Sequence, residues 1–142
     1  MWLRNCWYVI AWEHEIPATD SPDLFTRKVL NEPILVFRPD SGSMVAMADK
    51  CCHRHAPLSV GKREGDGVRC GYHGMMFNAQ GQCIDVPGMD KPPAKACIKT
   101  YPLAVKNQWV FVWMGDPALA DPAMLPDNFS CDHPDWVNIP GY

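Results

Sequence analysis

Two short motifs, each with one cysteine and one histidine, constrain this chain more than any other feature. The first motif is Cys51-x-His53 and the second is Cys70-x-x-His73, with sixteen residues between them. A gap of one or two residues places both side chains of a motif on one tight turn. Each turn can therefore present a thiolate and an imidazole to the same point, and the chain is expected to fold so that the two turns meet.

Two thiolates and two neutral imidazoles form the ligand set of a Rieske [2Fe–2S] cluster, in which two cysteines bind one iron and two histidines bind the other. The same residue types can also build a tetrahedral zinc site. Structural zinc sites usually begin with two cysteines and close with two histidines, whereas here each motif contributes one of each. This mixed pairing favours the cluster and leaves a zinc-stabilised binding module as the alternative.

The residues around the motifs extend this interpretation. The pattern C-x-H-R-x-A-P-L-S, followed by C-x-Y-H-G-x-x-F-x-x-x-G-x-C, resembles the N-terminal Rieske domain of the Rieske non-haem iron oxygenases. It resembles in particular the oxygenase components of vanillate O-demethylase and dicamba O-demethylase. Residues 4–9 and 112–117 also fit, so the resemblance covers about the whole chain. One departure is Cys52, where relatives usually carry proline, but the ligand spacing still selects Cys51.

The resemblance implies a fold, a cofactor and partners. We expect an all-β chain with the Rieske iron–sulfur fold, in which antiparallel sheets carry a small cluster-binding subdomain made of two ligand loops. Cys51, His53, Cys70 and His73 are expected to hold a Rieske-type 2Fe–2S cluster, with His73 facing the electron acceptor. The donor would be an NAD(P)H-dependent reductase or a ferredoxin. The acceptor would be an oxygenase catalytic domain, such as that of a neighbouring subunit.

The expected function is one-electron transfer from the reductase to a mononuclear iron site, within an aromatic-compound oxygenase or O-demethylase of aromatic catabolism. That iron is held by two histidines and one carboxylate in the resembled enzymes. We find no such motif in these 142 residues, so the chain is an oxidoreductase component that is not expected to turn over substrate alone. A stand-alone Rieske ferredoxin is the alternative. The resemblance of the C-terminal segment favours the oxygenase.

Composition divides the chain near residue 115. Residues 1–115 are expected to form the Rieske 2Fe–2S domain, with the cluster-binding subdomain at about 49–87. Residues 116–142 contain many prolines and five aspartates but no lysine or arginine. Such a segment is typical of a strap over the domain surface or of a linker toward a catalytic domain.

Short runs of aromatic and β-branched residues, separated by turns, predict strands. The expected strands are 7–11, 25–30, 34–38, 44–48, 68–70, 98–105 and 109–113, with a hairpin over 77–84. A single helical turn is expected at 13–16 with an exposed His14, and a loop turn at 31–33. Trp109, Phe111 and Trp113 alternate along one strand, which predicts an aromatic face that belongs to the core.

Charge and cysteine content exclude several classes of protein. The net charge of −3 does not favour binding to the nucleic-acid backbone. Between residues 50 and 69 five basic residues face two acidic ones, so the cluster end should be locally positive, although a mixed solvated surface is the simpler interpretation. Seven cysteines at irregular spacing do not indicate a disulfide framework. We expect Cys6, Cys83 and Cys97 to be small apolar residues, and Cys131 to be exposed.

We find no apolar run of membrane-spanning length and no signal-peptide pattern at the N-terminus. The sequence therefore predicts a reducing, cytoplasmic location without membrane partners.

The residues that follow the second motif predict the reduction potential. High-potential respiratory Rieske proteins resemble each other in carrying serine and tyrosine shortly after the second His-Gly, and these hydroxyls donate to cluster sulfurs. The matching positions here are Met75 and Phe77, which have no hydroxyl. We expect a potential in the lower half of the Rieske range, about −150 to 0 mV.

Overall fold

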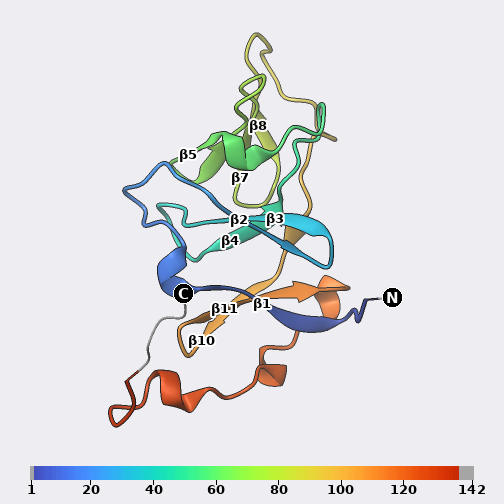
Figure 1. Cartoon of the computed structure of the whole chain (residues 1–142). Coiled ribbons are helices and arrows are strands. Elements are labelled where there is room, and N and C mark those ends of the chain that lie inside the picture. The colour runs from blue at the N-terminus through green and yellow to red at the C-terminus, as the bar shows by residue number, and fades with distance from the viewer. Residues whose placement is uncertain (1, 138–142) are drawn as a thin grey trace.

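The computed structural model describes residues 2–137, in which eleven strands form three antiparallel sheets (Figure 1). The lower sheet in Figure 1 consists of β1 (Cys6–Trp12), β11 (Trp109–Met114) and β10 (Leu103–Lys106), in that order. The middle sheet consists of β2 (Phe25–Val29), β3 (Glu32–Phe37), β4 (Val45–Ala48) and β9 (Thr100–Tyr101). The upper sheet consists of β5 (Lys62–Glu64), β6 (Gly67–Arg69), β7 (Met76–Asn78) and β8 (Cys83–Asp85).

The helices of the described chain are single 3-10 turns. They are η1 (Glu13–Glu15), η2 (Leu58–Val60), η3 (Pro117–Leu119), η4 (Pro122–Met124) and η5 (Phe129–Cys131). In the part that the structure describes, no helix is long and apolar enough to cross a membrane. The expected all-β class is confirmed, and His14 lies exposed in η1 as predicted.

Strand β3 separates two hydrophobic cores. Successive side chains of a strand point to opposite faces, so Ile34 and Val36 enter one core while Leu35 and Phe37 enter the other. All four are at most 1% exposed. The first core joins the middle sheet to the lower sheet. The second joins it to the upper sheet and contains both motif cysteines, so the candidate site is built on a core of its own.

The turn expected at 31–33 begins earlier. β3 starts at Glu32, and the turn that joins it to β2 consists of Leu30 and Asn31, with φ of 49° and 65°. Two successive left-handed residues make the tight hairpin whose twist matches its strands. Pro33 therefore lies inside the sheet, where its carbonyl accepts a hydrogen bond from the Asp49 N–H at 2.9 Å. Pro33 was expected in the turn because proline is common in turns, and the sequence alone does not show that Pro33 pairs with Lys28 of β2.

The single strand expected over 98–105 is divided at Pro102. β9 pairs with β4 in the middle sheet, whereas β10 pairs with β11 in the lower sheet. Proline has no N–H and cannot continue a ladder, but its carbonyl accepts from Trp113 N–H at 2.9 Å. The segment therefore ties two sheets together.

β5 was also not predicted, because its Lys-Arg-Glu sequence has no apolar alternation. The hairpin expected over 77–84 is present as β7 and β8, with Gly81 at φ 77°.

The aromatic face of β11 is mostly buried, as predicted for this stripe, but it lies outside the two cores, because Val110, Val112 and Met114 on the opposite face enter the first core. Trp113 and Phe111 are 1% and 3% exposed, and Trp109 is half-buried. The C-terminal segment (residues 116–137) lies against the lower sheet, where the indole N–H of Trp7 donates to the Asp121 carbonyl at 2.9 Å. The expected strap or linker extends to residue 142, and its last five residues lie outside the described chain.

Candidate metal centre

The first ligand loop connects β4 to η2 and is closed by two backbone hydrogen bonds. The N–H of Cys51 donates to the carbonyl of Ala56 at 2.8 Å, and the N–H of His55 donates back to the carbonyl of Cys51 at 3.0 Å. The chain therefore reverses within six residues. His53 lies at the tip of this reversal and is exposed.

The second ligand loop connects β6 to β7 and repeats the same pattern. Cys70 N–H donates to Met75 at 2.8 Å, and Gly74 N–H donates to Cys70 at 3.1 Å. In both loops the cysteine N–H bonds to the carbonyl five residues later, and the cysteine carbonyl accepts from the N–H four residues later. Counted from the cysteine, the fifth residue of each loop is left-handed, with φ of 60° at His55 and 75° at Gly74. The two loops are thus matched in backbone conformation, although their histidines stand at different positions.

The two motif cysteines lie at the inner side of the loops. Cys51 is 2% exposed and Cys70 is 3% exposed. Burial, with a further contribution from the adjacent Cys70 thiol, raises the pKa of Cys51 to about 11. A thiol in such a place ionises when a metal cation supplies the compensating charge, so this pair fits an iron of the cluster.

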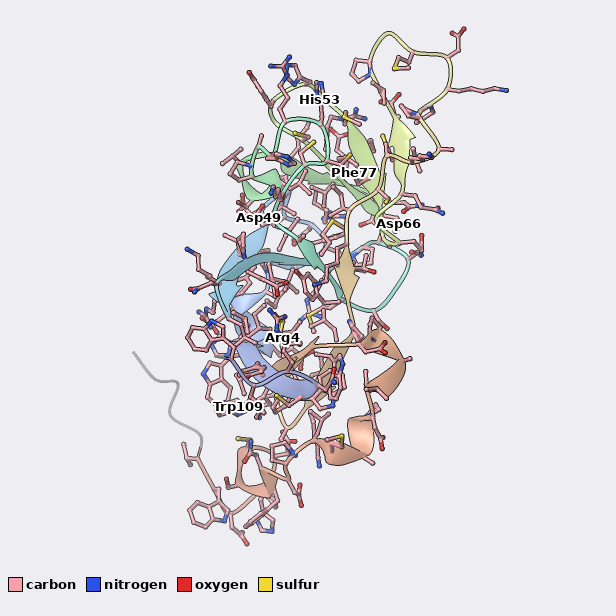
Figure 2. The ribbon with its side chains drawn as sticks, turned by 90° about the vertical axis from the view of Figure 1, so that its right-hand side faces the viewer. Arg4, Asp49, His53, Asp66, Phe77 and Trp109 are labelled. Atoms are coloured by element: carbon pink, nitrogen blue, oxygen red, sulfur yellow. The ribbon has the colours of Figure 1, made fainter. Side chains whose placement is uncertain are left out.

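The two motif histidines lie at the outer side. Both are exposed, and their ring centroids are 4.8 Å apart with an interplanar angle of 60°. The ring of Tyr72 packs on His73 at a centroid distance of 3.8 Å. Figure 2 shows His53 at one end of the molecule, beyond Phe77 of the second core. The imidazoles can therefore bind an outer iron and still contact a partner.

The four candidate ligands meet as two pairs rather than as one group. Among residues 2–137, no three histidine, cysteine, aspartate or glutamate side chains converge on one metal position. A Rieske cluster takes two protein ligands on each iron, whereas a structural zinc ion takes four. A buried thiol pair with an exposed imidazole pair is the donor set that the cluster requires.

A groove of about 400 Å³ begins at the two histidine rings. Its remaining walls are apolar and consist of Met75, Val86, Pro87, Met89 and Pro93. A larger cavity of about 550 Å³ lies beside η1 and includes none of the four candidate ligands. A further hollow of about 360 Å³ beside the second loop includes Cys70, so the groove is the concave surface at the imidazole pair.

Asp49 holds the first loop, and the sequence analysis did not single it out. It is the one buried charged residue of the described chain, at 7% exposure. One carboxylate oxygen accepts from the Ser59 N–H at 2.7 Å, and the other accepts from the Ser59 hydroxyl at 2.6 Å and from Thr26 Oγ1 at 3.0 Å. These bonds fix both ends of the loop to β2 and η2. Ser59 is part of the A-P-L-S pattern, but its partner could not be read from one sequence.

Arg69 holds the second loop and was also missed. Its Nη1 donates to the Gly74 carbonyl at 2.7 Å and to Asp85 Oδ2 at 2.9 Å, while Nε donates to Glu64 Oε2 at 2.7 Å. One guanidinium therefore connects the ligand loop with β5 and β8. In the sequence, Arg69 is only one of several basic residues between positions 50 and 69.

Other cysteines depart from expectation. Cys97 is exposed rather than buried, and Cys131 is half-buried rather than exposed. Cys131 lies in η5, where its carbonyl accepts from Gln108 Nε2 at 2.5 Å. Cys6 and Cys83 are half-buried, which fits their expected role as small apolar residues.

Comparisons with known proteins agree with this geometry. The family model described as Rieske [2Fe-2S] domain matches residues 6–102. The toluene-4-sulfonate monooxygenase system iron-sulfur subunit TsaM1 of Comamonas testosteroni is 51% identical over 142 residues, which are 100% of this chain and 40% of that protein. The dicamba O-demethylase oxygenase component of Stenotrophomonas maltophilia is 37% identical over 99% of this chain and 40% of its own.

A solved structure gives the same result. A crystal structure of dicamba monooxygenase bound to dicamba superposes with a TM-score of 0.83 at 36% identity, covering 92% of this chain and 38% of that one. The chain thus spans about 40% of the length of the curated relatives given above. The expected Rieske fold and Rieske-type 2Fe–2S cluster are confirmed, and the chain belongs to the Rieske [2Fe-2S] domain family.

Proposed function

We propose that Cys51 and Cys70 bind one iron of the cluster and that His53 and His73 bind the other. When bound, the cluster supplies a one-electron couple. The observation that carries this assignment is the division of the four side chains into a buried thiol pair and an exposed imidazole pair on two matched loops.

Electrons enter and leave at the histidine side of the site. The cysteines are enclosed by the second core, which would keep water and partners away from the iron that they would hold. The imidazole rings are exposed beside an apolar groove, so a partner that contacts them comes within reach of the outer iron. His73 is assigned to face the acceptor, and Tyr72 holds its ring from one side.

The partners are proposed from the relatives, which are named as oxygenase components and as an iron-sulfur subunit of a monooxygenase system. An NAD(P)H-dependent reductase or a ferredoxin would supply electrons. The acceptor would be the mononuclear iron of a catalytic domain, such as that of a neighbouring subunit. Residues 1–115 form the Rieske domain in this proposal, with cluster binding at about 49–87, and residues 116–142 lead toward the catalytic domain.

Relatives named for toluene-4-sulfonate, dicamba and vanillate suggest an aromatic acid as the substrate of the complete system. In this proposal the substrate binds to the catalytic domain, and the chain described here supplies the electrons for its oxidation.

Alanine variants test the ligand assignment. Each of the four substitutions is expected to reduce bound iron from about two per chain to nearly none, and to bleach the visible absorption, because the cluster also stabilises the fold. Cys52→Ala and His55→Ala are the matched controls, since each changes a neighbouring cysteine or histidine and should retain iron. Loss of iron from Cys52→Ala together with full iron in Cys51→Ala would show that the register is wrong.

A further inference from the structure

The two ligand loops leave the same end of one hairpin. The first loop continues through η2 into Gly61, which directly precedes β5, and the second loop begins at Cys70, which directly follows β6. β5 and β6 pair antiparallel, with Lys62 opposite Arg69 at this end. Continued by one step, the register places Gly61 opposite Cys70. The backbones of the two loops therefore meet beside a candidate ligand.

The contact between the loops is made by two glycines, Gly61 and Gly71. A Cβ atom added at Gly71 would lie 2.8 Å from the Val60 carbonyl oxygen and 3.3 Å from Gly61 Cα. A Cβ atom added at Gly61 would overlap the Arg69 carbonyl oxygen and lie 2.9 Å from the Gly71 nitrogen. Real Cβ atoms essentially never come within 3.0 Å of such neighbours, so only glycine allows this approach.

A left-handed backbone is not what requires glycine at these two positions. Gly61 has a φ of −89°, and Gly71 is not among the residues with positive φ. Gly65 and Gly74 of the same hairpin and loop differ, because their φ angles are 57° and 75°. The missing side chains of Gly61 and Gly71 thus serve the close approach of two backbones and not a turn.

Little else holds the two loops at a fixed distance. Apart from the adjacent Cys51 and Cys70 thiols, no hydrogen bond within residues 2–137 joins residues 51–61 to residues 70–75. Asp49 connects the first loop to β2 and η2, and Arg69 connects the second loop to β5 and β8. Apolar side chains of the second core lie between the loops, but side chains can change rotamer, whereas a backbone contact yields only when a loop moves.

The distance between the loops matters because each iron would be held from both of them. In the proposed assignment Cys51 and Cys70 share one iron, and His53 and His73 share the other. A shift of one loop against the other therefore changes the arrangement of the ligands at both irons, even when all four ligands are retained.

We propose that the contact between Gly61 and Gly71 sets the distance between the two ligand loops and so fixes the ligand geometry of the cluster. The proposal rests on the proposed ligand assignment. Both glycines are positioning residues, since they act through Cys70 and the loops and supply no metal ligand themselves.

Gly71→Ala tests the contact by a small displacement. The added Cβ atom requires the two backbones to separate by a few tenths of an ångström. The variant should keep about two irons per chain. Pulsed electron paramagnetic resonance of the dithionite-reduced protein should show altered histidine-nitrogen couplings, and a chelator should remove iron several-fold faster than from wild type. Gly61→Ala should have the larger effect on both measurements, because its Cβ atom would overlap a backbone oxygen.

Two other glycines provide matched controls. Gly65 lies at the opposite end of the same hairpin, where its φ of 57° strains any side chain but the nearest atom, Asp40 Oδ2, would be 3.8 Å from the added Cβ atom. Gly65→Ala should weaken the hairpin and leave the nitrogen couplings unchanged. Gly42→Ala meets no atom within 4 Å and should match wild type in every measurement.

The outcomes separate positioning from general stability. Couplings and iron-release rates of Gly71→Ala equal to those of wild type would overturn the proposal. Equal changes in Gly71→Ala and Gly65→Ala, or failure of Gly71→Ala to fold, would also overturn it, because the contact would then serve stability alone. Loss of iron from a folded Gly71→Ala chain, with iron retained in Gly65→Ala, would support it. Wild-type protein without iron or without nitrogen coupling would refute the ligand assignment itself, whereas normal wild-type coupling that Gly71→Ala leaves unchanged would refute only this inference.

Discussion

The conformation of the two ligand loops depends on residues other than the four candidate ligands. His55 and Gly74 take equivalent left-handed conformations, which a side chain usually disfavours by about 1 kcal/mol. The motifs single out the four candidate ligands because their spacing is local. Asp49 and Arg69 could not be predicted as loop anchors, because Ser59 and Asp85 lie 10 and 16 residues away from them.

Arg69 is expected to be the positioning residue of the second loop. Arg69→Gln removes donors to Gly74, Asp85 and Glu64, and should lower the free energy of unfolding by about 1–3 kcal/mol. It should also accelerate iron release to a chelator. Lys62→Gln is the control, since Lys62 pairs with the same Glu64 at 2.8 Å but is 61% exposed, and such pairs contribute little. Equal iron-release rates in both variants would show that Arg69 does not hold the loop.

Phe77 allows the predicted potential to be tested. It is 0% exposed in the core that contains both motif cysteines. Phe77→Tyr adds a hydroxyl to this core, and a bond from it to a thiolate sulfur should raise the potential, at about 60 mV for each 1.4 kcal/mol. Voltammetry of the wild type should give about −150 to 0 mV. A wild-type midpoint well above about +100 mV, in the upper part of the known range, would show that the missing hydroxyls do not set the potential.

At the scale of elements, Glu32 joins β3, β9 and the N-terminal arm. Its carboxylate accepts from Arg4 at 2.6 Å, from Tyr101 at 2.7 Å and from Lys99 at 3.0 Å. Burial alone would raise the pKa of Glu32, but these donors lower it to about 2. A depressed pKa contributes stability that is complete above the unfolded-state pKa, near 4.3, and is lost as the pH falls toward 2.

Urea unfolding against pH measures this contribution. Glu32→Gln should lower the free energy of unfolding by about 1–2 kcal/mol at pH 7. The difference from wild type should shrink between about pH 4.5 and pH 2. Asp90→Asn is the control, because Asp90 is exposed and makes no ion pair with the described residues. A difference that stays constant over this interval would mean that the carboxylate charge is not what stabilises the junction.

Strands with a run of apolar or aromatic residues could be predicted from the sequence. Strands whose existence or bounds depend on the neighbouring strand they pair with could not. The buried run of β3 and the aromatic run of β11 carry their own signal. β5 is polar, and the exchange of sheets at Pro102 depends on pairing with β4 and β11. The pairing of β9 with β4 joins residues more than 50 positions apart, which no local pattern reports.

At the scale of the whole molecule, the stacked sheets separate three tasks. The lower sheet carries the C-terminal segment, the middle sheet divides the cores, and the upper sheet and the two loops present the candidate ligands (Figure 1). The aspartates of the C-terminal segment lie at the end opposite to the upper sheet. The sequence favoured a mixed solvated surface over a locally positive cluster end, and it could not show the ion pairs, which leave five cations unpaired within residues 2–137.

Two cysteines and two histidines, rather than four cysteines, hold the cluster in the proposed assignment. Seven cysteines would suffice for an all-thiolate cluster, so the test must detect nitrogen. Pulsed electron paramagnetic resonance of the dithionite-reduced protein should show strong coupling to two histidine nitrogens, and this coupling should be lost with the signal in His53→Ala and His73→Ala. A cluster signal without nitrogen coupling, or one that persists unchanged in both variants, would contradict the assignment.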